Sequence, residues 1–143
     1  MVNQEIEILP EILYTHKIDH RNNSGEKSQW TITELEERSC FKYSLEYSWN
    51  KPHHYISWGL YFKNDKVEYL GNSAKNEPEL CQLFIAKFLD SSKNSKWHGY
   101  PANPSGQKPQ DIPPENVLGD WLSKQYLRPQ LIRKITRGQK CKL

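Results

Sequence analysis

The stretch FKYSLEYSW, residues 41–49, has the clearest local pattern in the chain and decides the fold that we predict. Its large side chains stand at alternate positions: Phe41, Tyr43, Leu45, Tyr47 and Trp49. Since successive side chains of a strand point to opposite faces, this period of two predicts a strand buried on one side. After a turn at 50–52, a second strand is predicted from the alternating residues Ile56, Trp58, Leu60 and Phe62.

Two neighbouring segments complete the predicted core. Asn64 and Asp65 are typical of a hairpin turn, so residues 67–70 are expected to return as the third strand of an antiparallel meander. Residues 5–14 and 30–33 also resemble strands and would extend one edge of the sheet. From residue 77 the apolar period lengthens to helical spacing, which predicts an amphipathic helix over 77–90 that covers the sheet.

The C-terminal third is predicted to be a loop followed by two short helices. Residues 97–114 contain five of the nine prolines, which predicts irregular structure. The first helix would begin at Pro114 and the second would run from Pro129 to Gly138. The side chains expected to be buried are Val117, Leu118, Trp121 and Leu122 in the first helix, and Leu131, Ile132 and Ile135 in the second.

The predicted fold class is therefore α+β: an antiparallel β-meander sheet covered by one amphipathic helix, followed by a Pro-rich loop and a C-terminal helical pair. A length of 143 residues suits one domain. We expect that domain to span 1–143, with a core of sheet and helix over about 1–92, the Pro-rich loop over 97–114 and the basic helical pair over about 115–138.

Positive charge collects at the C-terminal end of the chain. Residues 1–80 hold nine Lys and Arg against thirteen Asp and Glu, and residues 81–121 hold four of each sign. The last 22 residues hold seven cations and no acid. These cations are Lys124, Arg128, Arg133, Lys134, Arg137, Lys140 and Lys142. Such asymmetry predicts a surface that binds nucleic acid or an acidic partner protein, although a merely solvated helix face is the alternative.

One short motif suggests chemistry. In the stretch KWHGYP, residues 96–101, His98 lies between Lys96 and Tyr100 on a segment rich in Pro and Gly. Imidazole titrates near neutral pH, and a lysine would stabilise the charge of a phosphorane, so these three residues are candidates for metal-independent RNA cleavage. The alternative is that the aromatic residues anchor a loop and that His98 makes a structural hydrogen bond.

Other site classes receive no candidate from the sequence. The pairs His53/His54 and His16/His20 lack the geometry or companions of a metal site, so we predict no metal and no cofactor. Cys40, Cys81 and Cys141 form no CxxC pair, which favours a reducing environment. No leader-like start and no run of ~20 apolar residues is present. We expect a cytoplasmic protein without membrane contact, of undetermined oligomeric state.

Two partial resemblances add to these expectations. The β-β-β-α order expected over 41–90, with Gly71, Ser73 and Lys75 before the helix, resembles the second half of a double-stranded-RNA-binding domain, without the doubled lysines at that helix start. The ending from Trp97-His98-Gly99-Tyr100-Pro101 to Gly138-Gln139-Lys140-Cys141 is similar to that of small uncharacterised bacterial proteins. The first resemblance implies RNA binding, and the second implies no function.

The function expected from the sequence is that of a small binding or accessory protein that contacts nucleic acid through its basic C-terminal surface. A protein-binding immunity or antitoxin-like factor is the first alternative, because an acidic partner would satisfy the same cations. The second alternative is a small ribonuclease-type toxin that uses His98.

Overall fold

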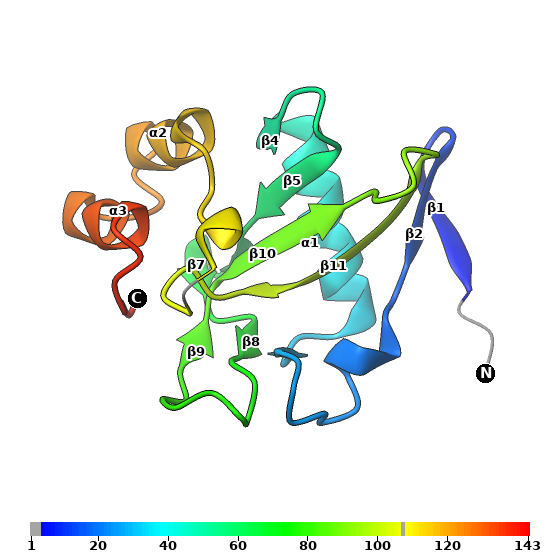
Figure 1. Cartoon of the computed structure of the whole chain (residues 1–143). Coiled ribbons are helices and arrows are strands. Elements are labelled where there is room, and N and C mark those ends of the chain that lie inside the picture. The colour runs from blue at the N-terminus through cyan, green and yellow to red at the C-terminus, as the bar shows by residue number, and fades with distance from the viewer. Residues whose placement is uncertain (1–3, 107) are drawn as a thin grey trace.

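The computed structural model describes residues 4–106 and 108–143 and has an α+β architecture (Figure 1). Its main element is a six-stranded sheet in the order β1-β2-β11-β10-β5-β4. The strands are β1 (Glu5–Leu9), β2 (Ile12–Thr15), β11 (Lys96–Ala102), β10 (Ile85–Leu89), β5 (Ile56–Gly59) and β4 (Asn50–Lys51). Strand β2 runs parallel to β11 and every other pair is antiparallel, so the sheet is mixed and is not the antiparallel meander that we predicted.

Two small sheets accompany the main one. The first has the order β3-β8-β9, made of β3 (Gln29–Trp30), β8 (Gly71–Asn72) and β9 (Gln82–Leu83). The second is the hairpin of β6 (Tyr61–Lys63) and β7 (Lys66–Glu68). Its turn residues Asn64 and Asp65 have φ of +54° and +63°. Positive φ at both central positions is the geometry of a type I′ turn, which confirms the predicted hairpin.

The decisive stretch 41–49 is not a strand, because most of it belongs to helix α1 (Glu34–Glu46). The helix begins with a capping box in which Thr33 and Glu36 bond each other's backbone amides. Alternate positions lie about 200° apart on a helix, so Phe41 is buried whereas Tyr43 and Tyr47 lie on the exposed side, stacked at 5.6 Å. An alternating pattern therefore arose from two opposite helix faces.

The predicted helix over 77–90 is also wrong, because this segment contains β9 and β10. Strand β10 is buried on both faces: Phe88 points toward α1, and Ile85 points toward the C-terminal helices. A strand covered on both sides reads as a continuous apolar run, which periodicity alone does not separate from a buried helix. The β-β-β-α order that resembled a double-stranded-RNA-binding domain is consequently not present.

The predicted Pro-rich loop begins later than expected. Residues 96–102 form β11, between β10 and β2, with Gly99 packed so closely against Phe88 that an added Cβ would lie 2.3 Å from its ring. Among the described residues the pairing of β11 with β2 ends at Trp97, so Pro101 interrupts no ladder hydrogen bond on that side. Between Ala102 and Pro114 the described residues are irregular apart from the 3₁₀ helix η2 (Pro109–Asp111). Gln107 of this predicted loop lies outside the described residues.

The C-terminal helical pair agrees closely with prediction. Helix α2 spans Glu115–Ser123 and α3 spans Pro129–Thr136. Their predicted inward residues are buried, except that Ile132 is half-buried and Leu122 is 38% exposed. The two helices lie together at the end of the sheet opposite the β1–β2 hairpin (Figure 1).

Two apolar clusters occupy the two faces of the main sheet. One joins α1 to β2 and β10 through Phe41, Tyr14 and Phe88. The other joins α2 and α3 to β5 and β10, with Trp121 and Trp58 near its centre. Within residues 4–106 and 108–143, no helix is long and apolar enough to cross a bilayer.

Candidate functional site

Helix α3 directs the basic side chains of the C-terminal segment toward solvent. Leu131 and Ile135 are buried against the second apolar cluster. Arg133 and Arg137 lie one turn apart on the exposed side. Gly138, with φ of +66°, ends the helix in the left-handed conformation that glycine accepts without strain. The sequence therefore folds so that the apolar stripe of α3 is covered and its cations remain in water.

We use the term basic C-terminal surface for the exposed set Lys124, Arg128, Arg133, Lys134, Arg137, Lys140 and Lys142. Two of its members are paired: Lys124 lies 2.9 Å from Asp120, and Lys140 lies 3.0 Å from Glu79. In the part of the chain that the structure describes, the other five have no acidic side chain within salt-bridge distance. Cations in the last turn of α3 also stabilise the helix through its dipole, but this does not neutralise them.

A groove of about 570 Å³ lies between the C-terminal tail and the small β3-β8-β9 sheet. Lys140 and Lys142 of the basic C-terminal surface line it, together with Lys75 from the segment after β8. Among the described residues no Asp or Glu contributes to the lining. Its volume falls within the roughly 300–1,000 Å³ of known ligand sites. The groove extends the basic surface to a cation that the charge count did not single out.

The three catalytic candidates lie in a row along one face of β11. Tyr100 donates its hydroxyl hydrogen to Asp111 at 2.7 Å, and Lys96 lies 3.3 Å from Glu5. A strand rises by roughly 3.3 Å per residue, so Lys96 and Tyr100 are separated by about 13 Å and do not converge. Burial, with Lys17 and His20 nearby, lowers the pKa of His98, which favours a neutral imidazole.

His20 is a residue that sequence reasoning did not connect with this motif. Its ring stacks on Tyr100 with centroids 5.4 Å apart and an interplanar angle of 16°. Its Nδ1 lies 2.8 Å from the carbonyl oxygen of Ser28, so Nδ1 carries the proton and donates it. His20 and Tyr100 both line a cavity of about 260 Å³. No local pattern signalled this contact, because it depends on how η1 (Ile18–His20) meets β11.

A buried ion pair holds the Pro-rich segment on the sheet. Lys87 Nζ on β10 lies 3.5 Å from Asp111 Oδ1 and donates to the carbonyl of Gln110 at 2.7 Å. Asp111 Oδ2 accepts from the backbone amide of Asn103 at 3.2 Å. Burial lowers the pKa of Lys87, and the Asp111 carboxylate partly opposes this effect. Lys87 and Asp111 therefore find their polar partners within the protein, so we assign this cluster a structural role in holding the Pro-rich segment against the sheet.

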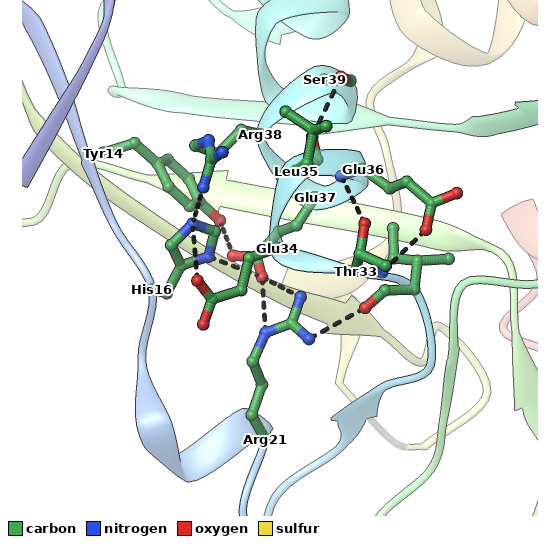
Figure 2. A network of polar contacts seen from close by, with 11 residues as sticks. Tyr14, His16, Arg21, Thr33, Glu34, Leu35, Glu36, Glu37, Arg38 and Ser39 are labelled. Atoms are coloured by element: carbon green, nitrogen blue, oxygen red, sulfur yellow. Dashed lines mark hydrogen bonds and ion pairs between the residues drawn. The ribbon is translucent and has the colours of Figure 1, made fainter.

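A second polar network joins β2 and η1 to the start of α1 (Figure 2). Glu37 is fully buried; it accepts from Tyr14 and from Arg21, whose Nη2 lies 2.7 Å from Oε1. The guanidinium of Arg38 donates to His16 Nε2 at 3.0 Å, and the other ring nitrogen, Nδ1, faces Glu37. That Nδ1 lies 3.0 Å from Glu37 without hydrogen-bond alignment. The network compensates a buried carboxylate and fixes the N-terminal hairpin to the helix.

Metal-binding groups are not found within residues 4–106 and 108–143, where no set of three or more His, Cys, Asp and Glu side chains is arranged to hold an ion. Cys40, Cys81 and Cys141 are free thiols. Comparison of the chain with models of protein families, with curated proteins and with solved structures finds no match. Function must therefore be argued from the surfaces described above.

Proposed function

We propose that this protein binds nucleic acid through the basic C-terminal surface. The observation that supports this proposal is the set of five exposed cations on α3, at its start and in the tail, that have no acidic partner among residues 4–106 and 108–143. Each such cation that reaches a phosphate releases a condensed counterion, and this release drives sequence-independent binding. Five phosphate contacts would give a slope of roughly −4 to −5 when log K is plotted against log salt on a duplex.

The test compares two variants that lose equal charge. Arg133→Ala/Arg137→Ala removes two neighbouring cations of α3, whereas Lys63→Ala/Lys66→Ala removes two exposed cations of the β6–β7 hairpin. Binding of a fluorescent duplex would be measured by anisotropy between about 50 and 200 mM salt. The α3 variant should bind roughly tenfold more weakly and with a slope reduced by about 2, while the hairpin variant should resemble the wild-type protein.

Three outcomes would contradict the proposal. Equal losses in the two variants would mean that net charge alone is responsible, and salt-insensitive binding would exclude phosphate contacts. Isolation of the protein with an acidic protein partner and without nucleic acid would support the immunity or antitoxin-like alternative. The ultraviolet absorbance spectrum of the purified material distinguishes nucleic acid from protein in that experiment.

Metal-independent RNA cleavage is a second candidate function, favoured by one observation. Burial lowers the pKa of His98, and Lys17 and His20 lie close enough to add to this effect. His20 also stacks on Tyr100 of the same strand. A neutral imidazole is suited to removing a proton from a ribose 2′-hydroxyl. His98→Ala should then abolish cleavage of a fluorogenic RNA, and an unchanged rate in that variant would exclude this function.

A further inference from the structure

The groove beside the basic C-terminal surface contains a row of amide side chains fixed by sheet register. Gln29 of β3 pairs with Asn72 of β8, and Asn72 pairs with Gln82 of β9. Paired positions of antiparallel strands carry their side chains on the same face of the sheet. All three residues line the groove of about 570 Å³. Three successive strands thus present one amide each to the same concave surface.

The three amides differ in what they already bind. The Gln29 side chain is buried; its Oε1 accepts from the Asn23 amide at 2.9 Å and its Nε2 donates to the Asp19 carbonyl at 2.8 Å. Asn72 and Gln82 are exposed, and within the described chain their side chains make no hydrogen bond to protein. Gln29 therefore anchors the row, and the other two amides are free to meet a ligand.

The remainder of the groove has the composition that a nucleotide chain requires. Lys75 and Lys142 supply positive charge around the amides, and Lys140, which is paired with Glu79, also lines the groove. Leu80, which is 65% exposed, and Tyr69 add apolar surface. The Tyr69 hydroxyl accepts from the backbone amide of Leu143 at 3.1 Å, so the end of the tail is tied to the wall of the groove. Charge, amides and apolar surface thus occur together in one cavity.

We infer that this groove binds a single-stranded segment of nucleic acid, with phosphates at Lys75 and Lys142 and base edges at Asn72 and Gln82. The inference rests on the proposed function and assigns its substrate class. An amide offers a donor and an acceptor side by side, as base edges do. The Watson–Crick edges are occupied by pairing in a duplex and accessible in a single strand, whose bases also stack on apolar and aromatic side chains. A flat basic surface suffices for the phosphates of a duplex, whereas a concave groove with free amides can also enclose the Watson–Crick edge of an unpaired base.

The experiment compares oligonucleotides of roughly 12 nucleotides, as single-stranded RNA, single-stranded DNA and the matching duplexes. Asn72→Ala/Gln82→Ala removes the two free amides of the row and leaves Gln29 in place, and among the described residues neither lost side chain makes a hydrogen bond to protein. The matched control, Asn94→Ala/Gln130→Ala, removes two exposed amides that do not line the groove. Circular dichroism and a thermal melt establish that each variant is folded. Comparison of the affinities for single-stranded RNA and single-stranded DNA shows whether the protein distinguishes ribose from deoxyribose.

The inference predicts that Asn72→Ala/Gln82→Ala weakens single-strand binding roughly tenfold and duplex binding by less than about twofold, with the control unchanged. Lys75→Ala should reduce the salt slope on single strands by about 0.7. In the wild-type protein, addition of the oligonucleotide should shift the side-chain amide NMR signals of Asn72 and Gln82. Wild-type-like single-strand binding by Asn72→Ala/Gln82→Ala would overturn the inference and leave the proposed function standing. Absence of any nucleic-acid binding by the wild-type protein would overturn both.

Discussion

Replacing Asp111 by Asn is the most sensitive test of how the Pro-rich segment is held on the sheet. Asp111 and Lys87 are 1% and 4% exposed. The Asp111 carboxylate also accepts hydrogen bonds from Tyr100 and from the Asn103 amide. An Asn side chain has one oxygen, so it loses the charge opposite Lys87 and leaves one of these two donors without an acceptor.

The expected magnitude follows from the burial of the pair. Removing one member of a buried ion pair costs about 3–5 kcal/mol, because the other charge remains away from water. For a chain of this size that corresponds to a fall in Tm of about 10–17 °C. Glu79→Gln breaks the surface pair with Lys140, where Glu79 is 74% exposed, and should change stability by about 0–1 kcal/mol.

The assay is urea unfolding followed by tryptophan fluorescence. A second variant, Lys87→Met/Asp111→Asn, should recover part of the loss, because it removes the isolated charge while keeping the apolar stem. Burial lowers the pKa of Lys87 in the folded protein, so the unfolded chain binds that proton more tightly. The contribution of Lys87 to stability therefore increases as pH rises through its folded pKa. Without Asp111 that pKa falls further, so the deficit of Asp111→Asn should shrink as pH rises from the lowered pKa of Lys87 in the variant to its pKa in the wild-type protein.

Two results would refute this reasoning. A loss below about 1 kcal/mol for Asp111→Asn would show that the pair is hydrated and unimportant. A double variant no more stable than Asp111→Asn would show that the loss comes from the hydrogen bonds to Asp111 and not from a buried charge on Lys87.

Three further predictions concern α1 and its surroundings. Cys40 is 2% exposed and burial raises its pKa, so a thiol reagent should modify it only after denaturant is added; immediate modification in the native protein would contradict the fold. Thr33→Ala should destabilise the protein by about 1 kcal/mol in urea unfolding through loss of the capping box, whereas Ser39→Ala, within the helix, should be neutral or stabilising. Tyr14→Phe removes a buried hydroxyl bonded to a carboxylate and should cost about 1–3 kcal/mol, against less than about 0.5 kcal/mol for the exposed Tyr43→Phe; equal effects would be contrary to Figure 2.

Local sequence signals predicted an element correctly where residues within that element determine its structure. The α3 helix was predicted from Pro129 and Gly138, and the β6–β7 hairpin from its turn residues, because caps and turns act over a few residues. The stretch 41–49 was wrongly predicted as a strand. Its large side chains alternate because they lie on two helix faces, one buried and one where two tyrosines stack. Strand β10 was wrongly predicted as part of a helix, because a strand buried on both faces has no alternation of apolar and polar residues.

The residues of the candidate site also fall into those that a local sequence signal predicts and those that only the tertiary structure brings together. The seven cations of the basic C-terminal surface are visible as a charge count. The amide row and Lys75 are not, because Gln29, Asn72 and Gln82 come together only through the register of three strands from distant parts of the chain. His20 is likewise brought to Tyr100 by tertiary packing alone. Sequence patterns predict which side chains a segment carries, and the long-range pairing of strands decides which other residues lie next to them in the fold.

The parallel pairing of β2 with β11 constrains the order in which the protein is assembled. The partners Leu13 and Lys96 are 83 residues apart in the sequence. During synthesis the N-terminal hairpin must wait for most of the polypeptide to emerge before its second strand finds a neighbour. Closing so long a loop is slow, since its entropy is lost before the contact is made. We therefore expect the β1–β2 hairpin to dock late, and an unpaired β2 edge to be the segment most exposed to aggregation in the nascent chain.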